Sequence, residues 1–153
     1  MIDLLRESTW MYPLVQVVHI VGFIVLAGAA ILFDLRVLGL TSTLGPAPVA
    51  IRPLGLHLLP WSVLAALLVV PSGVLMFVVD APALVGNTAF VVKIGLLALA
   101  AGNALAFHMG PGRGWAGWEQ PGSAVPAGAK LHAAASLVIW IAIVGCGRLI
   151  AYV

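Results

Sequence analysis

The sequence predicts an all-α fold: an integral membrane bundle of four helices that run up and down. Three observations support this prediction. Of the 153 residues, 63% are hydrophobic and only 8% are charged, with a mean hydropathy of +1.17. Soluble domains are about half apolar and about a quarter charged. Four apolar runs are each long enough to cross a hydrocarbon core of about 30 Å. The runs are continuous rather than alternating, which excludes the strands of a membrane barrel.

The four predicted spans cover residues 13–33, 58–79, 89–107 and 131–147. The opening stretch MIDLLRESTW carries three charged residues, and no small-residue cleavage site follows the first apolar run. It therefore does not resemble a removable signal peptide, and the first span is expected to stay in the protein. The remaining segments are loops and ends, so residues 1–153 are predicted to form a single transmembrane domain.

An even number of spans places both termini on one face, here called side A, and the loops after the first and third spans on the opposite face, side B. The basic residues toward side A are Arg6, Lys93 and Arg148, and those toward side B are Arg36, Arg52, Arg113 and Lys130. Positive charge favours the cytoplasmic face, so side B is expected to be cytoplasmic and the termini external. Trp115 and Trp118 are expected to join an aromatic belt at side B.

Small residues and prolines predict how the helices pack. Ala98, Gly102 and Ala106 recur every four positions of the third span, and such positions let helix backbones approach one another in a membrane. Gly22 and Gly28 are expected to do the same in the first span. Pro71 lies in the middle of the second span and is expected to kink it.

Several function classes are excluded by what the sequence lacks. Cys146 is the only cysteine, so there is no disulfide framework, CxxC pair or CxxCH haem attachment. The scattered basic residues form no phosphate-binding patch, which argues against nucleic acid. GxGxxG at 112–117 follows a membrane helix rather than a strand, so it is not a dinucleotide fingerprint. No complete catalytic set is visible, and independent catalysis is not expected.

The Gly-, Pro- and Trp-rich loop 109–128 is expected to be an ordered cap, a partner interface or an ordinary connector.

Each predicted span has one histidine within it or directly next to its end, and these are the candidate cofactor ligands: His19, His57, His108 and His132. At 1.5 Å per residue, His19 lies about 9 Å from side A, whereas His108 and His132 lie roughly 22 and 24 Å from it. Neutral imidazole binds haem iron, copper or zinc. His108 and His132 suit one haem b by depth, with His57 as the alternative partner, and these three histidines are also the candidate metal ligands.

Structural explanations of the same residues stay open. A histidine in a membrane helix often hydrogen-bonds a neighbouring helix or sits among the lipid head groups. Asp34 and Arg36 are expected to be an interfacial pair or snorkelling charges rather than a proton relay, and Lys93 is expected to snorkel to side A. Cys146 is expected to be a small packing residue.

Three stretches of the chain carry a resemblance: 17–40 (VVHIVGFIVLAGAAILFDLRVLGL), 87–108 (NTAFVVKIGLLALAAGNALAFH) and 129–152 (AKLHAAASLVIWIAIVGCGRLIAY). They resemble a family of uncharacterised bacterial four-helix integral membrane proteins, and more distantly the copper-resistance protein D membrane domain and small cytochrome b membrane subunits. The residues that match the close family's motifs are His19, Phe33 to Arg36, Lys93, Asn103 and His108. The resemblance implies the bacterial inner membrane and, through the cytochromes, haem b held by paired histidines. His19 departs from that pattern in depth, so one haem is expected rather than two.

Two functions follow as hypotheses. The first is a small cytochrome-b-like membrane protein that binds haem b and transfers electrons, with copper or no cofactor as alternatives. The second is a protein without catalysis: an accessory subunit or scaffold of a membrane complex, or a carrier of a metal ion or small solute. Expected partners are the lipid bilayer and either other membrane subunits or further copies of this chain.

Overall fold

The computed structural model describes residues 8–41, 50–118, 120 and 123–152, and it is helical. The long helices are α2 (Met11–Val37), α3 (Ile51–Gly86), α4 (Thr88–Met109) and α5 (Ala127–Leu149), and a short 3-10 helix, η1 (Pro111–Gly117), follows α4. All four long helices are long and apolar enough to cross a membrane. The predicted all-α membrane bundle is therefore confirmed, and each helix extends beyond its predicted span. Most of the opening stretch, residues 1–10, lies outside the described residues, so the expectation that it is not a removable signal peptide stays a prediction.

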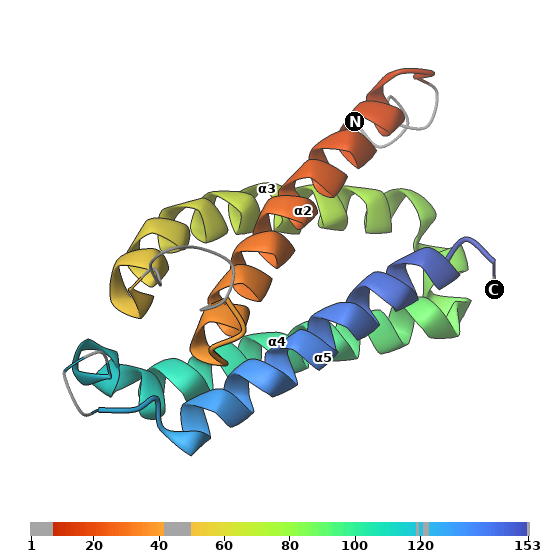
Figure 1. Ribbon diagram of the computed structural model, residues 1–153. Helices are drawn as coiled ribbons and strands as arrows, with labels where there is room; N and C mark the ends of the chain where they lie inside the picture. Colours follow the sequence, from red (N-terminus) through yellow and green to blue (C-terminus); the bar gives the residue numbers. More distant parts are fainter. Residues whose placement is uncertain (1–7, 42–49, 119, 121–122, 153) are drawn as a thin grey trace.

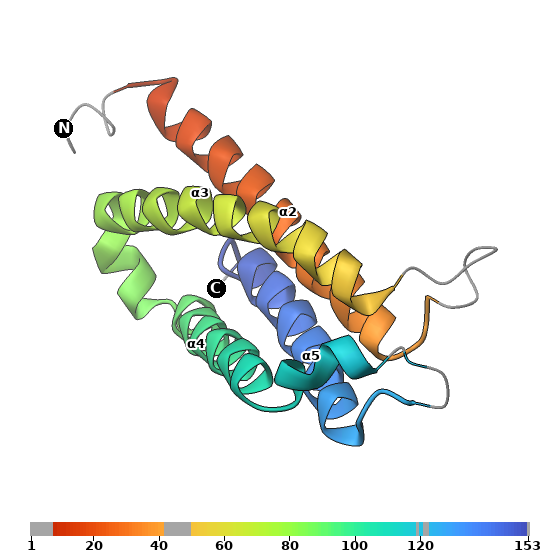
Figure 2. The same cartoon turned by 90° about the vertical axis from the view of Figure 1, so that its left-hand side faces the viewer.

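The helices alternate in direction but form two pairs rather than four equal corners (Figures 1 and 2). α2 packs along α3, α4 packs along α5, and the crossing of α2 with α5 joins the two pairs. α3 and α4 diverge from the turn that connects them, and near this turn the rings of Phe77 and Phe90 stack at 5.7 Å. α3 and α4 therefore contact each other much less than the helices within each pair do.

The interruption of α3 differs from the prediction. The backbone leaves helical geometry at Asp80 (φ −121°, ψ 25°), whereas the helix continues through Pro71. Pro82 explains the position of the break, because a proline removes one helical donor and clashes with the preceding turn. Beside Pro71, the Ser72 hydroxyl donates to the carbonyl oxygen of Leu68, one turn earlier in α3.

Small residues pack the helices only in part as predicted. Gly22 is buried against α3, where an added Cβ would lie 2.9 Å from Cγ2 of Val69. This close approach confirms the prediction for Gly22. Ala98, Gly102 and Ala106 are instead exposed on the outside of α4, so the prediction that they pack this bundle was wrong. Their spacing places them on one helix face, but the turn of α4 about its axis directs that face outward.

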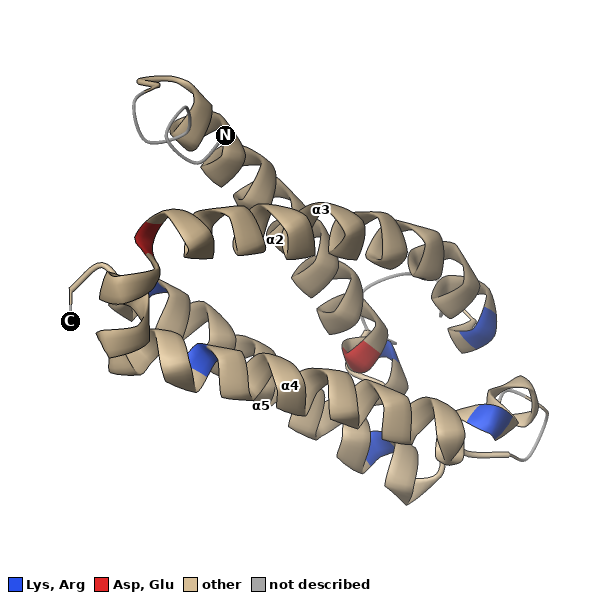
Figure 3. Ribbon diagram, turned by 180° about the vertical axis from the view of Figure 1, so that it is seen from behind, with Lys and Arg blue, Asp and Glu red and all other residues tan. Residues whose placement is uncertain are grey.

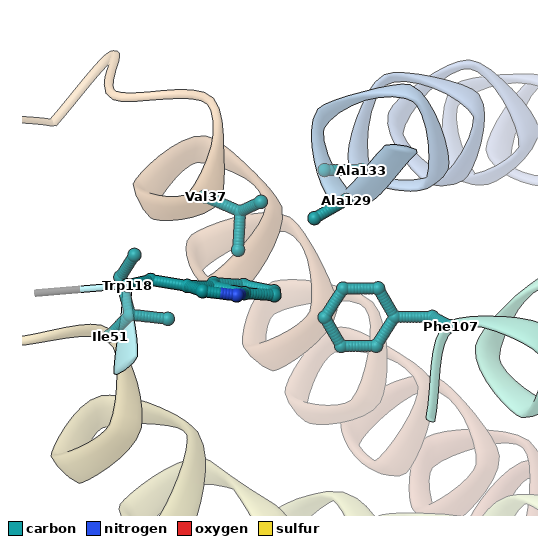
Figure 4. Close-up of a cluster of buried hydrophobic side chains, with 6 residues drawn as sticks. All are labelled: Val37, Ile51, Phe107, Trp118, Ala129 and Ala133. Carbon is teal, nitrogen blue, oxygen red and sulfur yellow. The ribbon is translucent and has the colours of Figure 1, made fainter. Parts of the chain in front are cut away.

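The main core lies at the side B end, where η1 folds back over the helices (Figure 4). Trp118 is 7% exposed and packs between Val37, Ile51 and the ring of Phe107, 6.1 Å away. The prediction that Trp118 belongs to an aromatic belt at the membrane surface was therefore wrong. The described part of loop 109–128 is an ordered cap, because its two indole rings are packed in the end of the bundle.

Candidate functional site

His19 of α2 is held against α3 at the turn that contains Pro71. Its Nδ1–H donates to the carbonyl oxygen of Val69 at 3.1 Å and lies 3.0 Å from Oγ of Ser72. A carbonyl oxygen only accepts, so the proton of the neutral ring sits on Nδ1 and Nε2 keeps its lone pair. Gly73 makes room for the ring, since a Cβ there would lie 3.1 Å from Cε1 of His19.

Lys93 of α4 reaches the same region from the other side. Its Nζ lies 5.7 Å from the centre of the Phe23 ring, and a Cβ added to Gly147 would lie 3.5 Å from Nζ. Lys93 is half-buried, and its amine is directed toward Gly147, near the side A end of α5. That it snorkels to side A stays a prediction. Within the described residues it makes no ion pair with a carboxylate.

The two side chains line one cavity of about 200 Å³. Its walls come from α2, α4 and α5, and the lining residues are His19, Ile20, Phe23, Lys93, Ile143, Val144 and Gly147. Ile20 and Val144 are exposed on the outside of their helices, so the rim of the cavity is apolar and lies on the outside of the bundle. The amine and the imidazole are the polar groups of an otherwise hydrocarbon wall.

His132 of α5 faces α4 and is tied to Asn103. Its Nδ1 lies 2.8 Å from Oδ1 of Asn103, and Nδ2 of Asn103 donates to the carbonyl oxygen of His132 at 3.0 Å. The amide oxygen accepts the imidazole proton, which again leaves Nε2 with a lone pair. The ring also contacts Phe107 edge-on, with 6.3 Å between the ring centres.

His108 and His57 lie elsewhere. His108 is exposed, and its Nδ1–H donates to the carbonyl oxygen of Ala104 on its own helix at 2.8 Å. Phe107 is buried and contacts both His108 and His132, so the two rings approach it from different directions. His57 is exposed on α3. The four candidate histidines are thus not gathered around one cavity, and no metal-binding group of three His, Cys, Asp or Glu occurs in the described chain.

Asp34 is the buried acidic group of the bundle. It is 7% exposed at the crossing of α2 with α5, where the Ser136 hydroxyl is within hydrogen-bonding reach of the carboxyl. Its Oδ2 is buried and has no hydrogen-bond partner among the described residues. The prediction of an interfacial Asp34–Arg36 pair was wrong, because the carboxyl faces α5 and makes no ion pair.

The sequence reasoning missed two of these features. Ser72 lies 3.0 Å from Nδ1 of His19, and no pattern within the second span predicts this contact. Ser136 was also missed, and no pattern within α5 points to a partner on α2. Charged side chains are few along the bundle, and most lie near the helix ends (Figure 3), which makes the inward Lys93 and the buried Asp34 exceptional.

Comparison of the chain with protein-family models, curated proteins and solved structures finds no match.

Proposed function

We propose that this multi-pass membrane protein binds the acidic head group of a membrane amphiphile in the cavity between His19 and Lys93. The observation that carries the proposal is the half-buried Lys93 amine, which lines this cavity without a carboxylate partner in the described chain. A cation inside a membrane bundle is expensive unless an opposite charge accompanies it. An anionic ligand supplies that charge.

The size and the rim of the cavity select the kind of ligand. Its volume of about 200 Å³ is below the range of about 300–1,000 Å³ typical for pockets that enclose whole small molecules. A head group fits inside, while an attached chain leaves over the exposed side chains of Ile20 and Val144 into the lipid. Carboxylate and phosphate-monoester heads share the required chemistry, an anionic oxygen that accepts from the Lys93 amine.

His19 acts as a fixed wall of this site. The hydrogen bond to Val69 and the contact with Ser72 hold the ring on α3, so its orientation is set before a ligand arrives. Preorganised groups bind with less loss of conformational entropy than mobile ones.

The test is binding of decanoate to the purified protein in a nonionic detergent, measured by isothermal titration calorimetry. The wild type is expected to bind saturably, and Lys93→Met to bind at least ten-fold more weakly, which corresponds to about 1.4 kcal/mol. Lys130→Met is the matched control, because Lys130 is exposed at the opposite end of α5. Titration with dodecyl phosphate, compared with decanoate, shows which of the two acidic head groups the protein binds more tightly. The proposal would be contradicted if Lys93→Met bound decanoate as tightly as the wild type does. It would also be contradicted if the wild type bound decanol as tightly as decanoate.

Haem binding with electron transfer is the second candidate function. It is supported by the Nδ1 atoms of His19, His108 and His132, each of which contacts an oxygen acceptor and so leaves Nε2 available. Metal-ligating histidines usually have this arrangement. Because these rings do not face one another across a shared cavity, the residues fit one axial ligand better than a pair.

The visible spectrum of the purified protein, oxidised and then reduced with dithionite, tests the haem proposal. Reduced b-type bands are expected, with His108→Ala abolishing or halving the haem content and His57→Ala changing it less. A colourless protein from cells supplied with ample haem would refute it.

We also propose that the protein lies in the bacterial inner membrane with side B in the cytoplasm. Accessibility labelling of single cysteines introduced into each loop would check this orientation.

A further inference from the structure

A second polar site lies at the crossing of α2 with α5, apart from the cavity of His19 and Lys93. Asp34 projects from the last turns of α2 into this crossing and is more than nine-tenths buried. Its Oδ2 has no hydrogen-bond partner among the described residues, whereas the Ser136 hydroxyl on α5 is within reach of the carboxyl. An acid buried this deeply without a partner for one oxygen requires a physical explanation.

Among the described residues, no cation is paired with this acid. The charged and titratable side chains toward this end of the bundle are Arg36 on α2, Arg52 and His57 on α3, His108 on α4, Arg113 on η1, and Lys130 and His132 on α5. Arg52, His57, His108, Arg113 and Lys130 are exposed, and His132 is engaged with Asn103. In the part of the chain that the structure describes, none of these groups forms an ion pair with Asp34.

An ionised carboxylate in such a place costs several kcal/mol when it is not paired. A bound cation removes the cost, and the surroundings decide which cation fits. Calcium takes six to eight oxygen ligands and magnesium needs an octahedral set. The crossing supplies the carboxyl and one hydroxyl, with otherwise apolar side chains such as Val37 and Ala133 nearby. A proton needs a single oxygen.

We propose that the crossing of α2 and α5 is a proton-binding site, in which Oδ2 of Asp34 carries an exchangeable proton and the other carboxyl oxygen accepts from Ser136. The site is independent of the proposed amphiphile cavity, because it shares no residue with it. Ser136 lies one helical turn beyond His132 on α5, so the donor to the acid and the His132–Asn103 pair occupy neighbouring turns of this helix.

Infrared difference spectroscopy of the protein in lipid at neutral pH tests the proposal. The wild type minus Asp34→Asn spectrum is expected to show a carboxylic acid C=O band that shifts to lower frequency in deuterated water. Asp80→Asn is the matched control, because Asp80 is exposed and accepts from the Tyr12 hydroxyl at 3.0 Å, so it is expected to leave that band unchanged. Ser136→Ala is expected to raise the band frequency, since the C=O group loses its donor.

Three outcomes would overturn the proposal. A difference spectrum with carboxylate bands in place of the acid band would show that Asp34 is ionised. An acid band that appears only when sodium is replaced by choline would assign the site to a sodium ion. An unfolded Asp34→Asn variant together with an unchanged band in Ser136→Ala would also contradict the proposal, because the neutral amide matches a protonated acid in size and charge.

Discussion

His132 and Asn103 hold α5 and α4 together through a reciprocal pair of hydrogen bonds. The Nδ1 atom of His132 lies 2.8 Å from Oδ1 of Asn103, and Nδ2 of Asn103 donates to the backbone oxygen of His132 at 3.0 Å. Interhelical hydrogen bonds are one of the forces that associate helices in a membrane, where apolar burial supplies no net attraction. The pair therefore fixes both the distance and the rotation of the two helices at the side B end.

Removal of this pair is expected to destabilise the bundle measurably. Asn103→Ala should lower the free energy of unfolding by about 1 kcal/mol, since interhelical hydrogen bonds in membranes are worth up to about 1.7 kcal/mol. Unfolding in mixed micelles, followed by circular dichroism, measures the change. A double-mutant cycle with His132→Ala isolates the coupling energy. His57→Ala, at an exposed position, is the control and should have no effect. Additive effects of the two substitutions in the cycle would contradict the prediction.

The close approach of α2 to α3 is expected to depend on Gly22. A Cβ at this position would lie 2.9 Å from Val69 Cγ2 and 3.3 Å from Leu68 Cβ, so Gly22→Ala forces the helices apart. We expect a loss of about 1 kcal/mol in the free energy of unfolding. Gly28→Ala is the matched control on the same helix, because nothing lies within 4 Å of an added Cβ there. Alanine at Gly28 should leave stability unchanged or raise it by up to about 1 kcal/mol. Equal melting temperatures for the two variants would disprove the role of Gly22.

The cap at side B is expected to be a stabilising part of the fold rather than a passive connector. Trp118→Ala should lower the free energy of unfolding by about 3 kcal/mol, because the indole is 7% exposed and fills the core between Val37, Ile51 and Phe107. Trp61→Ala should change the free energy of unfolding by no more than about 0.5 kcal/mol, since Trp61 is 54% exposed. Thermal unfolding of both variants in the same detergent gives the comparison. Similar losses for both tryptophans would show that the cap does not stabilise the bundle.

The number of helices and their direction could be predicted from the sequence, because a run of about 20 apolar residues has one stable arrangement in a membrane. The predicted spans are each contained within a helix of the structure. The predicted helix ends were less accurate. The second span was predicted over 58–79, whereas α3 runs from Ile51 to Gly86, and its break falls at Asp80 rather than at Pro71.

The face that each helix turns toward its neighbours was decided only by the tertiary structure. In a soluble helix a polar stripe marks the outside, but in this chain buried and lipid-facing positions are equally apolar, so periodicity does not distinguish them. The outward direction of Ala98 and Gly102, the inward direction of Lys93 and the burial of Asp34 all follow from helix rotation. Rotation is set by specific contacts between helices, such as that of His19 with Val69. Four membrane helices with a histidine on each could be predicted from the residues alone, whereas helix packing sets which polar groups meet.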